Sequence, residues 1–197
     1  MKKILIAFIW IFLFVYVAPA QEFENMTNEA RTSYRQGDLD AARYALQQAM
    51  YEVDMAIGYA VLDILPEKLG NLEYSDELVG SINMGFIGLT ISRSYDNEDN
   101  QSVSVNIIGD SPLLAGVNAI LALPVFGSDP NQKRIRVDGY RGLLNKSENS
   151  SGDISWDIQI PFGNSLMTIA FKGINDESAV MEMANTLPIQ KIAAILQ

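Results

Sequence analysis

The chain has 197 residues, with 24 acidic and 14 basic side chains and neither cysteine nor histidine. The lack of cysteine excludes disulfides, thiolate nucleophiles and Cys-ligated zinc, and the lack of histidine excludes a Ser-His-Asp triad. The net charge of −10 argues against nucleic acid as a partner, because a protein that binds phosphates along a strand needs a basic face.

The first 20 residues have the three parts of a secretory signal peptide. Lys2 and Lys3 form a positive segment, residues 4–17 are uninterruptedly apolar, and residues 18–20 read Ala-Pro-Ala, an A-x-A cleavage signal. The alternative is a retained membrane anchor, which needs about 20 apolar residues. We therefore expect cleavage after Ala20 and an exported, periplasmic protein. Its mature chain should have no transmembrane segment and a net charge of −12, since both lysines leave with the signal.

Residues 21–66 are predicted to form a helical hairpin. Helix-forming residues dominate, and Gly37 followed by Asp38 interrupts them once, so we expect helices over about 24–36 and 39–65. In the second helix an apolar stripe recurs at intervals of three and four residues and should face a partner. The stripe comprises Leu46, Met50, Val53, Ile57, Ala60 or Val61, and Ile64.

Tyrosines mark a second side of the long helix. Tyr44, Tyr51 and Tyr59 are seven and eight residues apart, so they share one side, which differs from that of the apolar stripe. Tyr44 and Tyr51 are candidate contact residues for a partner. The alternative is that these rings cover the neighbouring helix.

Part of the hairpin resembles one tetratricopeptide repeat. The residues that carry the resemblance are Ala30, Tyr34, Gly37, Leu39, Ala42, Leu46 and Ala49. It implies that Ala42 and Ala49 lie where the two helices approach closely. The chain has no second copy, lacks the closing proline at its usual place and has a longer second helix. Since solenoids need several stacked repeats, the pattern favours an ordinary helix pair over a peptide-binding array.

Residues 81–197 are predicted to form an α+β domain, after a polar connector at about 67–80. Short hairpin connections make its sheet antiparallel, with about five to six strands and packed helices. Strands are expected at 86–95, 102–108, 133–137, 140–144, 154–160 and 165–171, and helices at 112–123 and 176–196, the last bent at Pro188. Alternation places Leu89, Ile91, Arg93 and Tyr95 on one face and points Val103, Val105 and Ile107 inward.

A longer series of motifs resembles a family of uncharacterised exported proteins of Gram-negative bacteria, over about residues 30–197. The motifs are Ser92-Arg93-Ser94-Tyr95, a valine-rich strand, Asp110-Ser111-Pro112-Leu113, Gly139-Tyr140 and the closing helix. The body is also loosely similar to the α-β-α sandwich of the PsbP-like fold. The resemblance implies a compartment and a fold, and it implies no reaction.

Residues 112–126 are apolar nearly all round, with Asn118 as their one polar side chain. One interpretation is a helix buried between the sheet and the hairpin. The other is that one face lines a cavity for an apolar ligand, or meets a partner or the membrane. The candidate contact residues are Leu113, Leu114, Val117, Ile120 and Leu121.

Five basic residues of the body are Arg93, Lys133, Arg134, Arg136 and Arg141. Arg134 and Arg136 share one face of their strand and are candidates for contact with a carboxylate or phosphate. A solvated sheet face is the alternative interpretation.

Carboxylates gather in the first turn of the body. Asp96, Glu98 and Asp99 are candidate ligands for calcium, which binds several oxygens, although the spacing of an EF-hand is missing. A charged turn also keeps a hairpin soluble and protects the sheet from edge pairing. Whether a metal binds is left open, and no cofactor is predicted.

The sequence contains no G-x-S-x-G, S-x-x-K, Walker A or G-x-G-x-x-G motif. We therefore predict a non-enzymatic binding or interaction protein of the bacterial cell envelope, with an envelope protein or an apolar small molecule as partner. One alternative is a periplasmic carrier of an apolar or lipid-like ligand. The second is an enzyme that uses carboxylates or a metal. The oligomeric state is left open.

Overall fold

The computed structural model describes residues 18–75, 81–85, 88–123 and 131–197. The chain divides into two compact units, Met1–Ala56 and Ile57–Gln197. The predicted signal peptide lies outside the described residues except for residues 18–20, which begin the first helix. In the described ranges, no helix combines the length and apolarity needed to cross a membrane.

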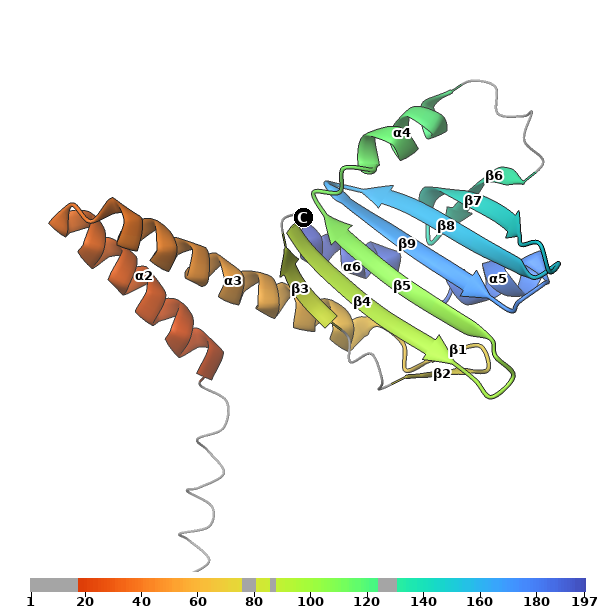
Figure 1. The fold of residues 1–197 in the computed structure, drawn as a ribbon, viewed down its shortest axis with the longest axis horizontal. Coiled ribbons are helices and arrows are strands. Elements are labelled where there is room, and N and C mark those ends of the chain that lie inside the picture. Colours follow the sequence, from red (N-terminus) through yellow and green to blue (C-terminus); the bar gives the residue numbers. More distant parts are fainter. Residues whose placement is uncertain (1–17, 76–80, 86–87, 124–130) are drawn as a thin grey trace, which may run out of the picture. The chain divides into compact units, whose positions relative to one another are not determined.

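The predicted helical hairpin consists of α2, Ala18–Gln36, and α3, Leu39–Ile64 (Figure 1). Gly37 has a φ of +81°, the left-handed conformation that ends many helices at a glycine. The carboxylate of Asp38 accepts a hydrogen bond of 3.0 Å from the backbone N–H of Ala41, as an N-cap does. The predicted break and the cap are confirmed, and α3 continues from the first unit into the second.

The described contact within the hairpin is made by small side chains. Ala42 and Ala49, which the repeat-like pattern places at a close approach, are buried, as are Ala30 and Ala45. By contrast, the first part of the predicted apolar stripe is exposed to solvent. The exposed fractions are 54% for Leu46, 66% for Met50 and 44% for Val53. Alanines therefore bring the helices together, while larger apolar side chains face outward.

The second unit contains an open antiparallel sheet, so the prediction of an α+β fold is confirmed. Its strand order is β1-β2-β4-β5-β9-β8-β7-β6, and β3 also pairs with β4. The strands are β1 Lys68–Leu69, β2 Leu72–Tyr74, β3 Ser81–Gly85, β4 Gly88–Asp96, β5 Ser102–Gly109, β6 Gln132–Val137, β7 Tyr140–Glu148, β8 Ile154–Phe162 and β9 Ser165–Lys172.

The predicted number of strands, about five to six, is wrong, because the described residues form nine. Two of the additional strands, β1 and β2, lie in what the sequence indicates as a polar connector. They are two and three residues long, too short to show an alternating pattern. In addition, β7 extends to Glu148, beyond the strand expected at 140–144, because it pairs with β8 along that length.

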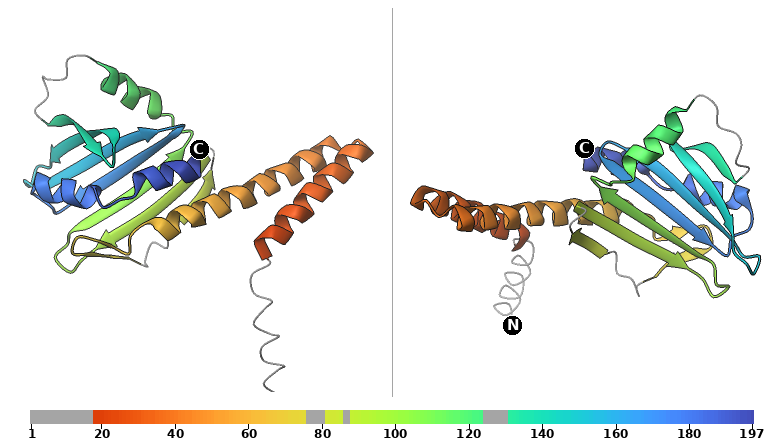
Figure 2. Two further views of the ribbon diagram at one scale, coloured as in Figure 1. Left: turned by 180° about the vertical axis from the view of Figure 1, so that it is seen from behind. Right: turned by 45° about the horizontal axis from the view of Figure 1, so that its top comes forward.

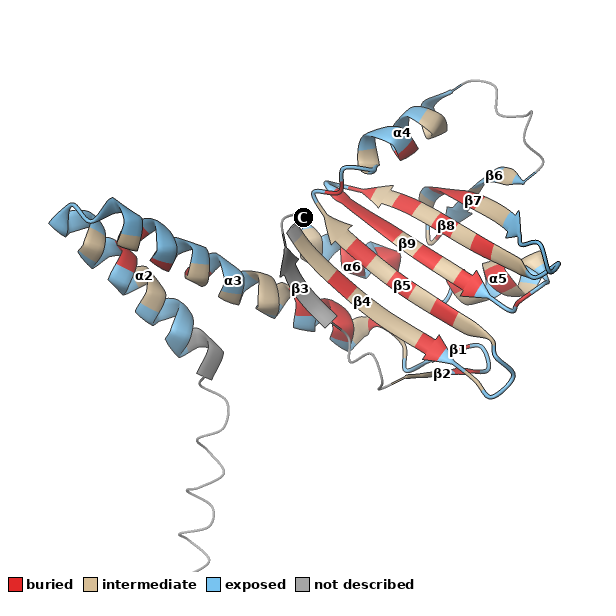
Figure 3. Ribbon diagram, in the orientation of Figure 1, coloured by how far each residue is buried: buried red, intermediate tan, exposed pale blue. Residues whose placement is uncertain are grey.

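Buried residues, red in Figure 3, alternate with less buried ones along the strands. The predicted inward residues of β5, Val103, Val105 and Ile107, are each at most 1% exposed. Helices α5, Glu177–Ala184, and α6, Ile189–Leu196, cover this face of the sheet (Figures 1 and 2). They replace the single bent helix expected over 176–196, and the break falls just before Pro188, as predicted.

The opposite face of the sheet is largely polar and partly covered. Helix α4, Leu114–Ala122, packs against β7 and β8 on the sheet, and Val117 is its one buried side chain. Leu143 of β7 is also buried, and it points to the same side as its cross-strand neighbour Arg134. This end of the sheet, where α4 meets the β6–β7 hairpin, holds the candidate site.

Candidate functional site: an arginine pocket

The structure gives three of the five predicted basic residues, Arg93, Lys133 and Arg134, a partner at the end of a helix. Arg93 donates from Nη1 to the carbonyl of Leu65 at 2.8 Å, and its guanidinium lies 4.8 Å from the centre of the Tyr74 ring. It thereby satisfies a carbonyl at the C-terminal end of α3, which the helix itself leaves unpaired. The neighbouring Tyr95 hydroxyl donates to the carbonyl of Pro66 at 2.8 Å.

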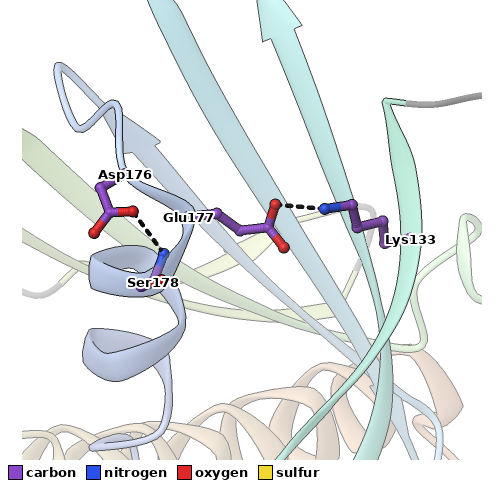
Figure 4. A network of polar contacts seen from close by, with 4 residues as sticks. All are labelled: Lys133, Asp176, Glu177 and Ser178. Atoms are coloured by element: carbon purple, nitrogen blue, oxygen red, sulfur yellow. Dashed lines mark hydrogen bonds and ion pairs between the residues drawn. The ribbon is translucent and has the colours of Figure 1, made fainter.

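Lys133 is used on the helix-covered face. Its Nζ lies 2.6 Å from a carboxylate oxygen of Glu177, the first residue of α5 (Figure 4). The preceding Asp176 caps the same helix by accepting hydrogen bonds from the N–H groups of Ser178 and Ala179. This ion pair ties strand β6 to the start of α5.

The side chain of Arg134 lies on the opposite face of the sheet from Lys133 and binds the C-terminal end of α4. Its Nη2 donates to the carbonyl of Ile120 at 3.0 Å and to that of Leu123. A cation at the C-terminus of a helix satisfies unpaired carbonyls and is favoured by the helix dipole. Arg134 therefore fixes α4 to the edge strand β6.

Arg136 and Arg141 remain, and they lie directly opposite each other on β6 and β7. Arg136 donates from Nη1 to the carbonyl of Gly139 at 3.3 Å. Within the described part of the chain, neither of the two arginines forms a salt bridge. Like charges directly opposite across antiparallel strands destabilise the pair, by up to about 1 kcal/mol.

One pocket of about 400 Å³ is lined by these two arginines together with Arg134, Leu121 of α4 and Ile135 of β6. The structure thus brings together residues from two separate predictions, the apolar contact residue Leu121 and the anion contacts Arg134 and Arg136. Guanidinium groups present planar forks of N–H donors that match carboxylate and phosphate oxygens. In a protein of net charge −10, this pocket is suited to an anion that carries an apolar part.

Arg141 is named among the basic residues in the sequence but is not predicted as an anion contact. Residues 138 and 139 read Asp-Gly, the typical two-residue turn of a β-hairpin, and both have positive φ values, +46° and +85°. Such a turn pairs 137 with 140 and therefore Arg136 with Arg141. The Asp-Gly signal was sufficient to find this pair.

The other predicted apolar contacts are not all equivalent. Val117 is buried against the sheet, Leu114 and Ile120 are half-buried, and Leu113 is 60% exposed. Tyr44 and Tyr51, 60% and 40% exposed, belong to the first compact unit. The prediction that these residues contact a ligand or a partner stays a prediction.

The carboxylates of the first turn do not assemble. Asp96, Glu98 and Asp99 are exposed, and the turn is held by the side chain of Asn97, which accepts hydrogen bonds from the N–H groups of Asp99 and Gln101. In the described ranges, no three His, Cys, Asp or Glu side chains come close enough to hold a metal ion.

Other pockets include charged side chains in their linings. One of about 390 Å³ contains Arg93 and Glu73, and one of about 500 Å³ contains Asp153 and Lys172. On the polar sheet face, burial raises the pKa of Asp157, whose cross-strand neighbours are Asn145 and Ala170. These neighbours provide no second carboxylate for a catalytic pair.

No family model matches this chain, and neither a curated protein nor a solved structure matches it.

Proposed function

We propose that the protein is an exported binding protein of the bacterial cell envelope, and that its arginine pocket takes the anionic group of an amphiphilic ligand. The arginine pocket comprises Leu121, Arg134, Ile135, Arg136 and Arg141. One observation carries the proposal: Arg136 and Arg141 face each other without a salt bridge to the described residues, at the edge of a pocket large enough for a small ligand.

The pocket can hold an anion but offers no proton acceptor. Its only ionisable lining residues are arginines, which stay protonated at all physiological pH values. A carboxylate or phosphate between Arg136 and Arg141 would relieve their mutual repulsion through charge-assisted hydrogen bonds. Leu121 would contact an attached alkyl part. These features support binding over acid–base catalysis. The proposal combines two of the predictions from the sequence, a binding protein and a carrier of a lipid-like ligand.

The test is calorimetric titration with four probes: inorganic phosphate, octyl phosphate, octanoate and octanol. We expect octyl phosphate and octanoate to bind more tightly than phosphate, octanol not to bind, and affinity to fall as salt screens the exposed charges. The double variant R136Q/R141Q should lose at least about tenfold in affinity, because each charge-assisted hydrogen bond contributes about 1.5–3 kcal/mol. Arg134 is left unchanged because it holds α4.

The matched control is K172Q/K191Q, which removes the same charge from two exposed lysines outside the pocket. If both double variants weakened binding equally, the loss of affinity would come from the change in net charge. That outcome would contradict a specific anion site in the arginine pocket. Binding of phosphatidylglycerol vesicles, with no binding of the soluble probes, would identify a lipid headgroup in a membrane as the anion. No binding of any of these anions would overturn the proposal.

A further inference from the structure

Helix α3 presents a row of large apolar side chains to solvent. Leu39, Leu46 and Val53 are seven residues apart and Met50 lies between the last two, so all four share one side of the helix. We call these four residues the leucine face. Their exposed fractions run from 44% for Val53 to 66% for Met50. Among the described residues of the first unit, the only other element is α2, and the buried side chains of this unit are alanines.

The leucine face differs from the tyrosine side of the same helix. A tyrosine can remain exposed at modest cost because its hydroxyl bonds to water, whereas leucine, methionine and valine offer no polar group. A contiguous exposed surface of such side chains marks a contact with a partner. Of the two sides of α3, the leucine face is therefore the better candidate for a buried interface.

The spacing of the face is that of a coiled-coil seam. Leu39, Leu46 and Val53 occupy one heptad position, and Arg43 and Met50 occupy the other. A single charged residue in such a seam selects the register and orientation of the partner helix. Arg43 is exposed, and it forms no hydrogen bond or ion pair in the described chain.

Asp54 flanks the same face eleven residues after Arg43, about 16 Å along the helix. It is half-buried without a cation partner among the described residues, and burial raises the pKa of its carboxyl. If two α3 helices ran parallel and in register, Arg43 would meet Arg43 and Asp54 would meet Asp54. If they run antiparallel about a twofold axis near residue 48, Arg43 meets Asp54 twice, and Leu46 packs beside Met50.

We propose that the leucine face is a self-association surface, on which a second copy of this chain packs with its α3 antiparallel to the first. The twofold relation makes one face complementary to itself in both shape and charge. Four side chains per copy form a seam smaller than a standard interface, so the dimer should be weak, with a dissociation constant in roughly the micromolar range or above. The surface lies on α3 and does not depend on the arginine pocket.

The experiment is sedimentation equilibrium of the purified protein over a range of concentrations. The wild type is compared with two variants in which one charge is reversed. R43D places a carboxylate opposite Asp54 of the second copy, and D54R places a guanidinium opposite Arg43. Each variant alone should therefore dimerise at least about tenfold more weakly than the wild type, because two attractions become two repulsions. An equimolar mixture of R43D and D54R restores both attractions, one with its signs exchanged and one as in the wild type. We expect it to recover the wild-type dissociation constant as a heterodimer.

Two further variants keep the test decisive if a reversed charge disturbs folding. L46Q should weaken the dimer and leave the helix content by circular dichroism unchanged, whereas Y44Q, on the tyrosine side, should leave the dimer unchanged. Monomer at all concentrations, or a mixture that fails to recover, would overturn the proposal. So would a monomer that binds phosphatidylglycerol vesicles through Leu46, since the face would then serve a membrane.

Discussion

The helical hairpin and the sheet use apolar residues in opposite ways. In the sheet, the large side chains are inside: Ile158, Ile169 and Phe171 are at most 1% exposed. In the first unit, which holds α2 and most of α3, the buried side chains are alanines, and the leucine face, Tyr34, Tyr44 and Tyr51 are exposed. Since burial of large apolar side chains provides most of the stabilisation of a domain, the sheet unit has its own core.

The difference indicates separate roles. A pair of helices whose buried side chains are alanines buries little apolar surface, and most helical stability in proteins comes from the packing of an apolar face. The hairpin therefore gains most from a partner, whereas the sheet positions side chains rigidly. The arginine pocket is accordingly on the sheet and α4, and the proposed self-association surface is on α3.

The largest expected contrast comes from truncating one apolar residue in each region. Ile158→Ala should lower the free energy of unfolding by about 2–5 kcal/mol, because it leaves a cavity between Leu144 and Ile169. Leu46→Ala should change it by less than about 0.5 kcal/mol in the dilute monomer. Urea unfolding measures both, followed by the fluorescence of Trp156 for the sheet unit and by circular dichroism for the helices of the first unit. Equal losses would mean that Leu46 is buried in the monomer, contrary to the comparison.

The turn of the hairpin provides a second test. Gly37→Ala should destabilise the hairpin by about 1–2 kcal/mol, because alanine resists the left-handed conformation, while no atom lies within 4 Å of the added carbon. Gly116→Ala in α4 also meets open space, and it should stabilise its helix by about 0.5–1 kcal/mol. Amide hydrogen exchange resolved by helix measures each effect. Faster exchange in α5 on Gly37→Ala would contradict a local effect.

Stability at alkaline pH tests the contact of Tyr95 with the residues that follow α3. Burial raises the pKa of Tyr95 to about 12, while an unfolded tyrosine ionises near 10. The contribution of Tyr95 is thus complete below pH 10 and is lost as pH rises toward 12, because the unfolded state then releases a proton that the folded state retains. Tyr95→Phe should cost about 0.5–1.5 kcal/mol at neutral pH by removing the hydrogen bond to Pro66.

Denaturant unfolding between pH 8 and 11.5 compares the free energies of unfolding of the wild type and Tyr95→Phe. The stability difference between wild type and Tyr95→Phe should shrink as the pH rises above 10. Tyr59→Phe, whose hydroxyl is on an exposed side chain, is the control and should leave the pH profile unchanged. A constant difference across the range would contradict the burial of the Tyr95 hydroxyl.

The smallest effect concerns the arginine pocket itself. Arg136→Gln should raise the free energy of unfolding by about 0.2–1 kcal/mol, because it removes the like-charge pair with Arg141. The same substitution should weaken binding of octyl phosphate. Thermal unfolding with and without the probe measures both, and Lys191→Gln is the control. A loss of stability without ligand would mean that Arg136 has a structural role instead.

Local patterns were sufficient for much of the fold. The break at Gly37 and Asp38, the inward side of β5 and the division of the last helix before Pro188 follow from turn residues and periodicity. Each of these signals acts within a few residues, so the sequence alone carries it. Two of the three arginines of the pocket were also predicted, and the Asp138-Gly139 turn would have added the third.

What only the tertiary structure decided depends on contacts between distant residues. Strands β1, β2 and β3 exist because β4 and its neighbours offer an edge for pairing, and no local periodicity marks them. The basic residues look alike in sequence, yet Arg93 and Arg134 donate to carbonyls at helix ends and Lys133 pairs with Glu177. The composition determined the net charge of the protein. The positions of the helix ends determined which basic side chains are used there, and therefore which arginines remain in the pocket without a salt bridge to the described residues.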